Sequence, residues 1–74
     1  MINKSKSNPK HNIAKNLQKL RRDKNLSQND LSRETGLSVN IIAKIEVGIS
    51  KNPTISTLLR ITQALGKNME DLLK

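Results

Sequence analysis

Three observations on the sequence predict an all-α fold, a compact bundle of five short helices. Apolar residues recur at spacings of three and four over most of the 74-residue chain, which is the periodicity of helices with one buried face. Each of the three glycines comes directly after such a stretch, where a helix commonly ends. No segment alternates apolar and polar residues as a half-buried strand does.

The first helix is expected to begin at Asn8-Pro9, because Asn is a favoured N-cap and Pro is favoured in the first turn. Asn12 is a competing N-cap. The helix should end near Lys24, since Asn25 suits the left-handed residue that closes a helix. Its buried face carries three residues at spacings of four and three: Ile13, Leu17 and Leu20.

The second helix is predicted over residues 28–35, with Leu31 buried. Ser27 and Asp30 form a Ser-x-x-Asp start, a near relative of the capping box. Gly36 should end the helix, because glycine adopts a positive φ without a penalty from a Cβ atom.

The third helix is predicted over about residues 39–47. Ser38 is its expected N-cap, and Gly48 follows its end. Ile42 and Ile45, three residues apart, are expected to point into the core.

The fourth helix follows a polar, Pro-containing loop at residues 49–53 and is capped by Thr54. Its apolar set has five members: Ile55, Leu58, Leu59, Ile61 and Leu65. A last helical turn or two should start at Asn68. Glu70 and Asp71 then stand in its first turn, where the helix dipole favours acids.

Positive charge is concentrated at one end of the chain. The net charge is +8, and residues 1–26 hold eight Lys or Arg against one acid, whereas residues 27–74 hold six against five. Residues 1–8 are predicted to form a flexible basic arm before a domain at residues 9–74. The charge favours a polyanionic partner such as nucleic acid, although a solvated basic surface is the alternative. The absence of aromatic residues disfavours base-stacking RNA modules.

Other function classes find little support in the composition. There is no cysteine and only one histidine, His11, so we expect neither a disulfide scaffold nor a metal site. No carboxylate pair, activated nucleophile or glycine-rich phosphate loop suggests catalysis or a cofactor. No apolar run approaches the length of a membrane span. We expect a cytoplasmic protein that is not an enzyme.

The second and third predicted helices, joined by three residues around Gly36, have the pattern of a helix-turn-helix. The alternative is a generic helical hairpin. The outward face of the third helix distinguishes the two, because it is small and carries one amide and one cation: Asn40, Ala43, Lys44 and Val47. Such a face can approach the major groove closely, whereas an ordinary exposed face more often carries Glu/Lys pairs.

Three segments, in this order, resemble the phage Cro/repressor-type (XRE-type) helix-turn-helix family over about residues 12–73. They are Leu26-Ser27-Gln28-x-x-Leu31-Ser32-x-x-x-Gly36-Leu37-Ser38, Ile42-x-x-Ile45-Glu46-x-Gly48, and Pro53-Thr54-x-x-Thr57-Leu58-Leu59-x-Ile61-x-x-Ala64-Leu65-Gly66. The chain departs from the family at Ser32, where alanine is usual, and at Asn25, where glycine is usual. The resemblance implies a lambda-repressor-like bundle whose second helix crosses the phosphate backbone and whose third helix enters the major groove.

The resemblance also implies contacts to DNA, residue by residue. Base contacts are expected from Val39, Asn40, Ala43 and Lys44. Phosphate contacts are expected from Ser27, Gln28, Ser38, Lys51 and Asn52. The amide of Asn40 suits adenine, the amine of Lys44 suits guanine or a phosphate, and the apolar side chains suit a thymine methyl group. The alternatives are a core-edge position for Val39, capping alone for Ser27, and a solvated loop for Lys51 and Asn52.

Three further expectations concern residues beside these contacts. Arg21 and Glu46 match a pair that bridges the first and third helices in several family members, which implies a partly buried structural salt bridge. Ile41 lies off the buried face and is expected at the sugar–phosphate wall, a thymine methyl group or a partner subunit. The arm could follow the DNA backbone or minor groove through its lysines, or be a solubilising tail: Lys4, Lys6 and Lys10.

The sequence therefore predicts a sequence-specific double-stranded DNA-binding transcriptional regulator, a repressor that binds a palindromic operator as a homodimer. Met69, Leu72 and Leu73 are candidates for the dimer surface, unless they close the core. The first alternative is an antitoxin of the same fold that binds a partner protein and autoregulates its operon. A second alternative is membrane-surface or calmodulin-like binding through the basic first helix. The narrow apolar face of that helix, which the core needs, disfavours it.

Overall fold

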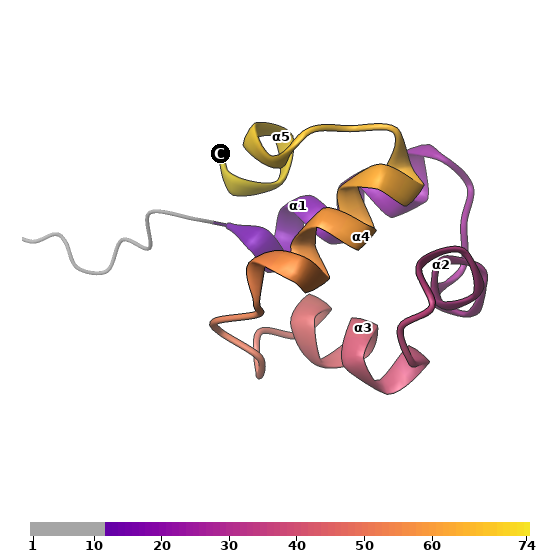
Figure 1. Ribbon diagram of the computed structural model, residues 1–74, viewed down its shortest axis with the longest axis horizontal. Helices are drawn as coiled ribbons and strands as arrows, with labels where there is room; N and C mark the ends of the chain where they lie inside the picture. Colours follow the sequence, from indigo (N-terminus) through magenta and orange to yellow (C-terminus); the bar gives the residue numbers. More distant parts are fainter. Residues whose placement is uncertain (1–11) are drawn as a thin grey trace, which may run out of the picture.

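The computed structural model describes residues 12–74, and within them all regular structure is helical (Figure 1). The helices are α1 (Ile13–Asp23), α2 (Gln28–Thr35), α3 (Val39–Glu46), α4 (Ile55–Leu65) and α5 (Met69–Leu73). This confirms the all-α, five-helix prediction. The predicted basic arm, its lysines, His11 and the helix start at Asn8-Pro9 lie outside the described residues.

Side-chain caps fix the starts of four helices. The N-cap side chains of Ser27, Ser38, Thr54 and Asn68 each accept a hydrogen bond from the backbone amide three residues later. Both α2 and α5 have full capping boxes, closed by Asp30 and Asp71. Asn12 is the N-cap of α1 without a side-chain bond to its helix. The caps confirm the predicted starts of α2, α3, α4 and α5.

The helix ends show where left-handed backbone is needed. Asn25, two residues after α1, has a φ of 59°, and Gly36, after α2, has a φ of 78°. A Cβ atom at Gly36 would also lie 3.4 Å from Nη1 of Arg60 on α4. That distance is an ordinary van der Waals contact with the end of a flexible side chain, so glycine is needed at this position for the left-handed turn and not for the packing of α4. The third helix ends at Glu46 with Val47 as its C-cap, one residue before the predicted end.

The core receives at least one side chain from every helix. Its buried apolar residues are Leu17, Leu31, Ile42, Ile45, Leu58, Ile61, Leu65 and Leu72. In Figure 1, α3 lies on the opposite side of the bundle from α5. It packs against α1 and α2, while α4 packs against α2 and α5. This arrangement leaves one face of α3 outside the bundle.

Two residues assigned to the apolar set of α4 lie outside the core, so that part of the prediction is wrong. Ile55 and Leu59 are 69% and 44% exposed. The buried stripe of α4 consists of Leu58, Ile61, Thr62 and Leu65 instead. Ile55 and Leu59 are four residues apart and share a neighbouring face of the helix.

Candidate nucleic-acid interface

The turn between α2 and α3 is held by side-chain hydroxyl groups. Ser32 donates a hydrogen bond of 2.5 Å to the carbonyl oxygen of Leu37. Thr35 is buried, donates to the carbonyl of Leu31 at 2.8 Å, and accepts the amide of Leu37 at 3.1 Å. The serine at position 32 thus ties the end of α2 to the turn, where an alanine would provide no such bond. These bonds fix the angle at which α3 leaves α2.

The outward face of α3 lies opposite its buried residues. Ile42, Ile45 and Glu46 are buried, while the side chains that point away from the core are exposed or half-buried. Asn40, Lys44 and Val47 are exposed, and Val39 and Ala43 are half-buried. The four predicted base-contact residues therefore belong to one short helix, with Val39 and Ala43 less exposed than Asn40 and Lys44. This face has an amide, an ammonium group and small apolar groups, and no acid.

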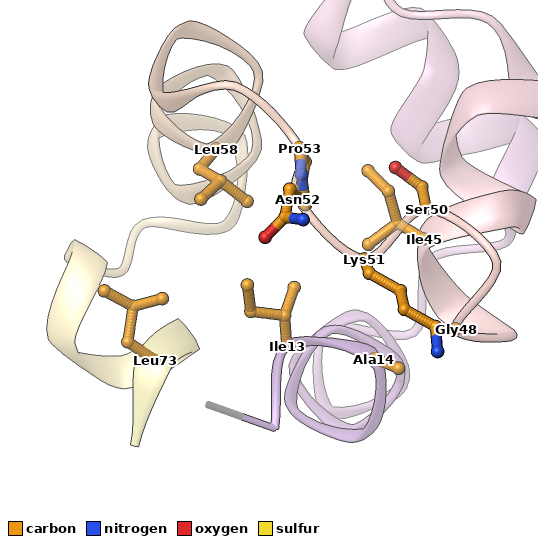
Figure 2. A pocket seen from close by; sticks show the side chains of 10 residues that line it. All are labelled: Ile13, Ala14, Ile45, Gly48, Ser50, Lys51, Asn52, Pro53, Leu58 and Leu73. Carbon is orange, nitrogen blue, oxygen red and sulfur yellow. The ribbon is translucent and has the colours of Figure 1, made fainter. Parts of the chain in front are cut away.

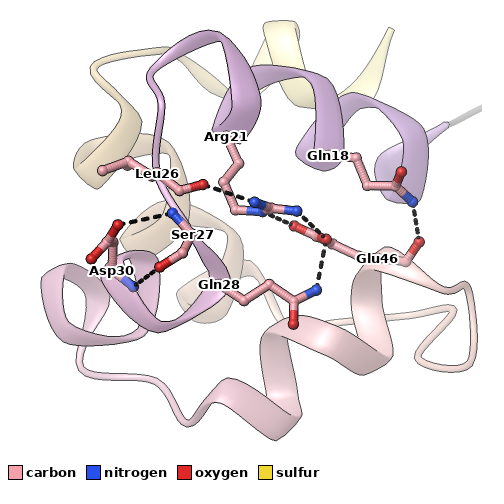
Figure 3. A network of polar contacts seen from close by, with 7 residues as sticks. All are labelled: Gln18, Arg21, Leu26, Ser27, Gln28, Asp30 and Glu46. Atoms are coloured by element: carbon pink, nitrogen blue, oxygen red, sulfur yellow. Dashed lines mark hydrogen bonds and ion pairs between the residues drawn. The ribbon is translucent and has the colours of Figure 1, made fainter.

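A buried ion pair joins α1 to the last residue of α3 (Figure 3). Arg21 donates from Nε to Oε2 of Glu46 at 2.6 Å and from Nη2 to Oε1 at 3.0 Å. The two residues are only 9% and 4% exposed. Arg21 also donates from Nη1 to the carbonyl of Leu26 at 2.8 Å. The bidentate geometry fixes both the distance and the orientation between the two helices.

Two glutamines complete the bonding of Glu46. Gln28, the first residue of α2, donates from Nε2 to Oε1 of Glu46 at 2.9 Å. Gln18 on α1 donates to the carbonyl oxygen of Glu46 at 2.7 Å. We call these four residues, Gln18, Arg21, Gln28 and Glu46, the Glu46 cluster. They join α1, α2 and α3 at one point, and no buried polar side-chain atom in the described part of the chain lacks a partner.

The charges in the Glu46 cluster stabilise each other. Burial by itself would raise the pKa of Glu46, but hydrogen bonds from Arg21 and Gln28 and the nearby charges of Arg21 and Arg22 outweigh it and lower that pKa. The hydrogen bond to Glu46 raises the pKa of Arg21 in turn. Both shifts favour the charged pair, so Glu46 is ionised at neutral pH.

Sequence reasoning missed Gln18. It lies three residues before Arg21 and therefore on the same side of α1, which is the local signal that could have suggested a shared partner.

Gln28 can make a second hydrogen bond in addition to the one with Glu46. Its amide nitrogen carries two hydrogens, so a bond to Glu46 uses one and a second bond can be donated elsewhere.

The predicted phosphate-contact residues fall into two groups. Ser27, Gln28 and Ser38 stand at the starts of α2 and α3, where both serines act as N-caps. Lys51 and Asn52 are exposed in the loop between α3 and α4. Both residues line a groove of about 730 Å³. Figure 2 shows them with the other side chains that line it, among them the apolar Ile13, Leu58 and Leu73. The loop therefore presents polar side chains next to the C-terminal end of α3.

Neither a metal cluster nor a membrane-spanning helix is found among residues 12–74. No group of three or more His, Cys, Asp or Glu side chains there could bind a metal ion. None of the helices is long and apolar enough to cross a bilayer.

Comparisons with known proteins agree with this geometry. A family model described as "Helix-turn-helix" matches residues 17–72. The chain is 35% identical to the uncharacterized HTH-type transcriptional regulator y4dJ of Sinorhizobium fredii over 60 residues. This matched region covers 81% of this chain and 77% of that protein.

Two solved structures are similar as well. The restriction-modification controller protein C.AhdI from Aeromonas hydrophila matches with a TM-score of 0.77 and 28% identity, over 82% of this chain and 91% of that one. HppE matches with a TM-score of 0.79 and 22% identity, and the match covers 90% of this chain and 37% of the HppE chain. At this identity the likeness shows a common fold alone.

Proposed function

Because the chain belongs to the XRE-type helix-turn-helix family of DNA-binding transcriptional regulators, we propose that it is a repressor that binds a palindromic operator as a dimer. In this proposal α3 lies in the major groove, and the start of α2 meets the phosphate backbone. The observation that carries the proposal is the outward face of α3, which is free of acids and anchored from behind by Ile42, Ile45 and Glu46.

The residues of α3 then divide the work of base recognition. Asn40 is exposed in the first turn, and its amide can bind N6 and N7 of adenine together. Lys44, one turn later on the same face, can reach O6 and N7 of guanine or a phosphate. Val39 and Ala43 are half-buried, so they can offer apolar contact only where the helix comes close to a base edge.

Phosphate contacts set the position of α3 in the groove. The starts of α2 and α3 present backbone N–H groups and the positive ends of helix dipoles, which attract an anion. Gln28 can donate one amide hydrogen to a phosphate while the other stays on Glu46. A phosphate held in this way would be linked to the C-terminal end of α3 through two hydrogen bonds. Lys51, Asn52 and Ser38 would add contacts along the same strand.

Self-association needs a surface outside the core, and α4 offers one. Leu72 is fully buried and Met69 packs against the core, so these two candidates close the bundle. Ile55 and Leu59 form an exposed apolar face of α4 instead. Residues 47–59, which include this face, hold one lysine and no acid, so repulsion between two copies of a chain with a net charge of +8 is weak there. We place the dimer contact at this face.

Selection from a randomised duplex library at about 150 mM salt tests the proposed function, because non-specific affinity is then only about 10⁻⁴–10⁻⁶ M. The expected result is enrichment of a palindrome whose half-sites are about ten base pairs apart. Enrichment of a single, asymmetric half-site would contradict the dimer. The absence of any enriched sequence would contradict operator binding, and co-purification of a protein partner would then support the antitoxin alternative.

A further inference from the structure

Ile41 is an exposed apolar residue in the first turn of α3, directly after Asn40. Its side chain is 43% exposed, whereas Ile42 is 0% exposed and Ile45 is 1% exposed. In a helix, consecutive residues are about 100° apart around the axis, so Ile41 lies to one side of the buried face. The core therefore does not account for the presence of an isoleucine at this position.

The other three helices with a side-chain N-cap have a polar residue at the position that corresponds to Ile41. It is the third residue after the N-cap, which is Asp30 in α2, Thr57 in α4 and Asp71 in α5. Each of those three side chains bonds back to its N-cap residue. Ile41 cannot return such a bond, although its amide donates to Ser38 Oγ at 3.1 Å. Helix α3 thus lacks this local stabilisation, and it also keeps negative charge away from its leading end.

The side chain of Ile41 is held in a defined direction. Its backbone is fixed by the Ser38 cap on one side and by buried Ile42 on the other. A β-branched side chain in a helix strongly prefers one χ1 rotamer. Little conformational entropy is therefore lost when Ile41 makes a contact, which favours a role in recognition over a loosely hydrated surface.

We propose that Ile41 determines specificity by contacting the 5-methyl group of a pyrimidine in the major groove. This inference rests on the proposed function, because it needs α3 in that groove. The methyl group of thymine is the one apolar group that the four bases present there. Cytosine methylated at C5 carries the same group at the same place. Next to it, Asn40 would read a neighbouring base by hydrogen bonds, so that one turn of α3 would combine polar and apolar recognition.

The test begins with the duplex that the wild-type protein selects from the randomised library. Each thymine in one half-site is replaced in turn by deoxyuridine, which lacks only the methyl group. We expect the Kd to rise about fourfold at the position that Ile41 contacts, the factor for burying one methyl group. A rise at a different position would belong to Val39 or Ala43 and would persist in Ile41→Ala. Cytosine and 5-methylcytosine at the position that Ile41 contacts then separate the two sources. A fourfold preference for 5-methylcytosine means that either base supplies the group, and equal binding means that thymine alone does.

Two variants connect this effect to Ile41. Ile41→Ala should bind the thymine and deoxyuridine duplexes equally, because the partner of the methyl group is gone. Ile49→Ala is the matched control, since Ile49 is an exposed isoleucine in the loop between α3 and α4, at 69%, and should keep the fourfold difference. Thermal unfolding should show both variants folded, as expected for changes at exposed sites.

Several results would overturn the inference. Deoxyuridine without effect at every position would do so while leaving the proposed function intact. A uniform loss for Ile41→Ala on both duplexes would place the side chain at the sugar–phosphate wall. A changed sedimentation coefficient of Ile41→Ala would place it at a partner subunit. Failure to select any duplex would overturn the proposed function, and this inference with it.

Discussion

The C-terminal end of α3 is bonded into the protein, whereas its first turn offers side chains to the solvent. At the C-terminal end, the carboxylate and the carbonyl of Glu46 accept bonds from Arg21, Gln28 and Gln18. In the first turn, Asn40 is exposed and Ile41 is 43% exposed, and the only side-chain bond is the Ser38 cap. This eight-residue helix thus has one end that hydrogen bonds hold in position and one end whose side chains are accessible to a ligand.

This difference shows how a chain of 74 residues can hold the proposed recognition surface in a fixed position. Its apolar core is small, and only two of the eight buried apolar side chains, Ile42 and Ile45, belong to α3. The Glu46 cluster adds directional bonds from two other helices, which help to fix the rotation of α3 about its axis. Changes at the C-terminal end of α3 should therefore affect folding, whereas changes in its first turn should affect sequence preference.

Removing Arg21 should have the largest effect. Arg21→Ala leaves Glu46, which is 4% exposed, with a buried charge and the amide of Gln28 as its remaining side-chain partner. The free energy of unfolding should fall by about 3–5 kcal/mol. Urea denaturation measures this loss. The matched control is Lys19→Ala on the same helix, whose ion pair with Asp23 has side chains that are 73% and 57% exposed. It should cost about 1 kcal/mol or less, and equal losses for the two variants would contradict the buried role of Arg21.

Acid should lower the stability that the Glu46 cluster provides, but by less than the loss of Arg21 does. The folded protein lowers the pKa of Glu46 below the unfolded value of about 4.3, so the stabilisation is complete above that pH and is lost as the pH falls through the folded pKa. Asp30 acts in the same direction, because bonds from the backbone and hydroxyl of Ser27 lower its pKa. The Tm should therefore fall below about pH 4. In Glu46→Gln this acid dependence should be reduced, with a remainder due to Asp30, and an unchanged dependence would contradict the assignment.

Asn40→Ala should change recognition without changing stability, because Asn40 is exposed. We expect a loss of about 1–3 kcal/mol at the selected operator and no loss on random DNA, measured by fluorescence anisotropy. Gln63→Ala removes another exposed amide, on α4, and should leave both affinities unchanged. Equal weakening of Asn40→Ala on operator and random duplexes would argue for a phosphate contact instead.

Lys51→Ala should have the smallest effect on sequence preference. Binding to all duplexes should weaken alike, and the slope of log K against log salt should decrease by about one unit. The control is Lys67→Ala, an exposed lysine in the turn between α4 and α5, which should leave the slope unchanged. A lysine in a solvated loop without a phosphate contact would instead give identical slopes for both variants.

Helix α2 shows how far local sequence signals reach. Its bounds match the prediction of residues 28–35, because Ser27 and Asp30 form a capping box at one end and Gly36 forces the left-handed turn at the other. Neither end depends on tertiary contacts. The helix-turn-helix could be predicted for the same reason, since its caps, glycine and inward isoleucines all lie within one short stretch of sequence.

The surface of α4 and the Glu46 cluster could be predicted only in part. Leu58 and Leu59 are adjacent, about 100° apart around the helix axis, and local periodicity with Ile55 and Ile61 did not decide which of them faces the core. The resemblance suggested Arg21 with Glu46, but not the bonds from Gln18 and Gln28. In the sequence, Gln18 is 28 positions from Glu46 and Gln28 is 18 positions from it, so these bonds form only when the three helices have packed. The DNA contacts remain predictions.

In the proposed complex the outward face of α3, beginning with Asn40 in its first turn, reads bases, and the Glu46 cluster positions this helix. The most direct test is parallel selection from one randomised duplex library by the wild-type protein and by Asn40→Ala. We expect the two enriched motifs to differ at one base position in each half-site and to agree everywhere else. Identical motifs would show that Asn40 does not read a base. Loss of all enrichment by a correctly folded variant would show that this residue contributes general affinity, and its assignment as a base reader would then be wrong.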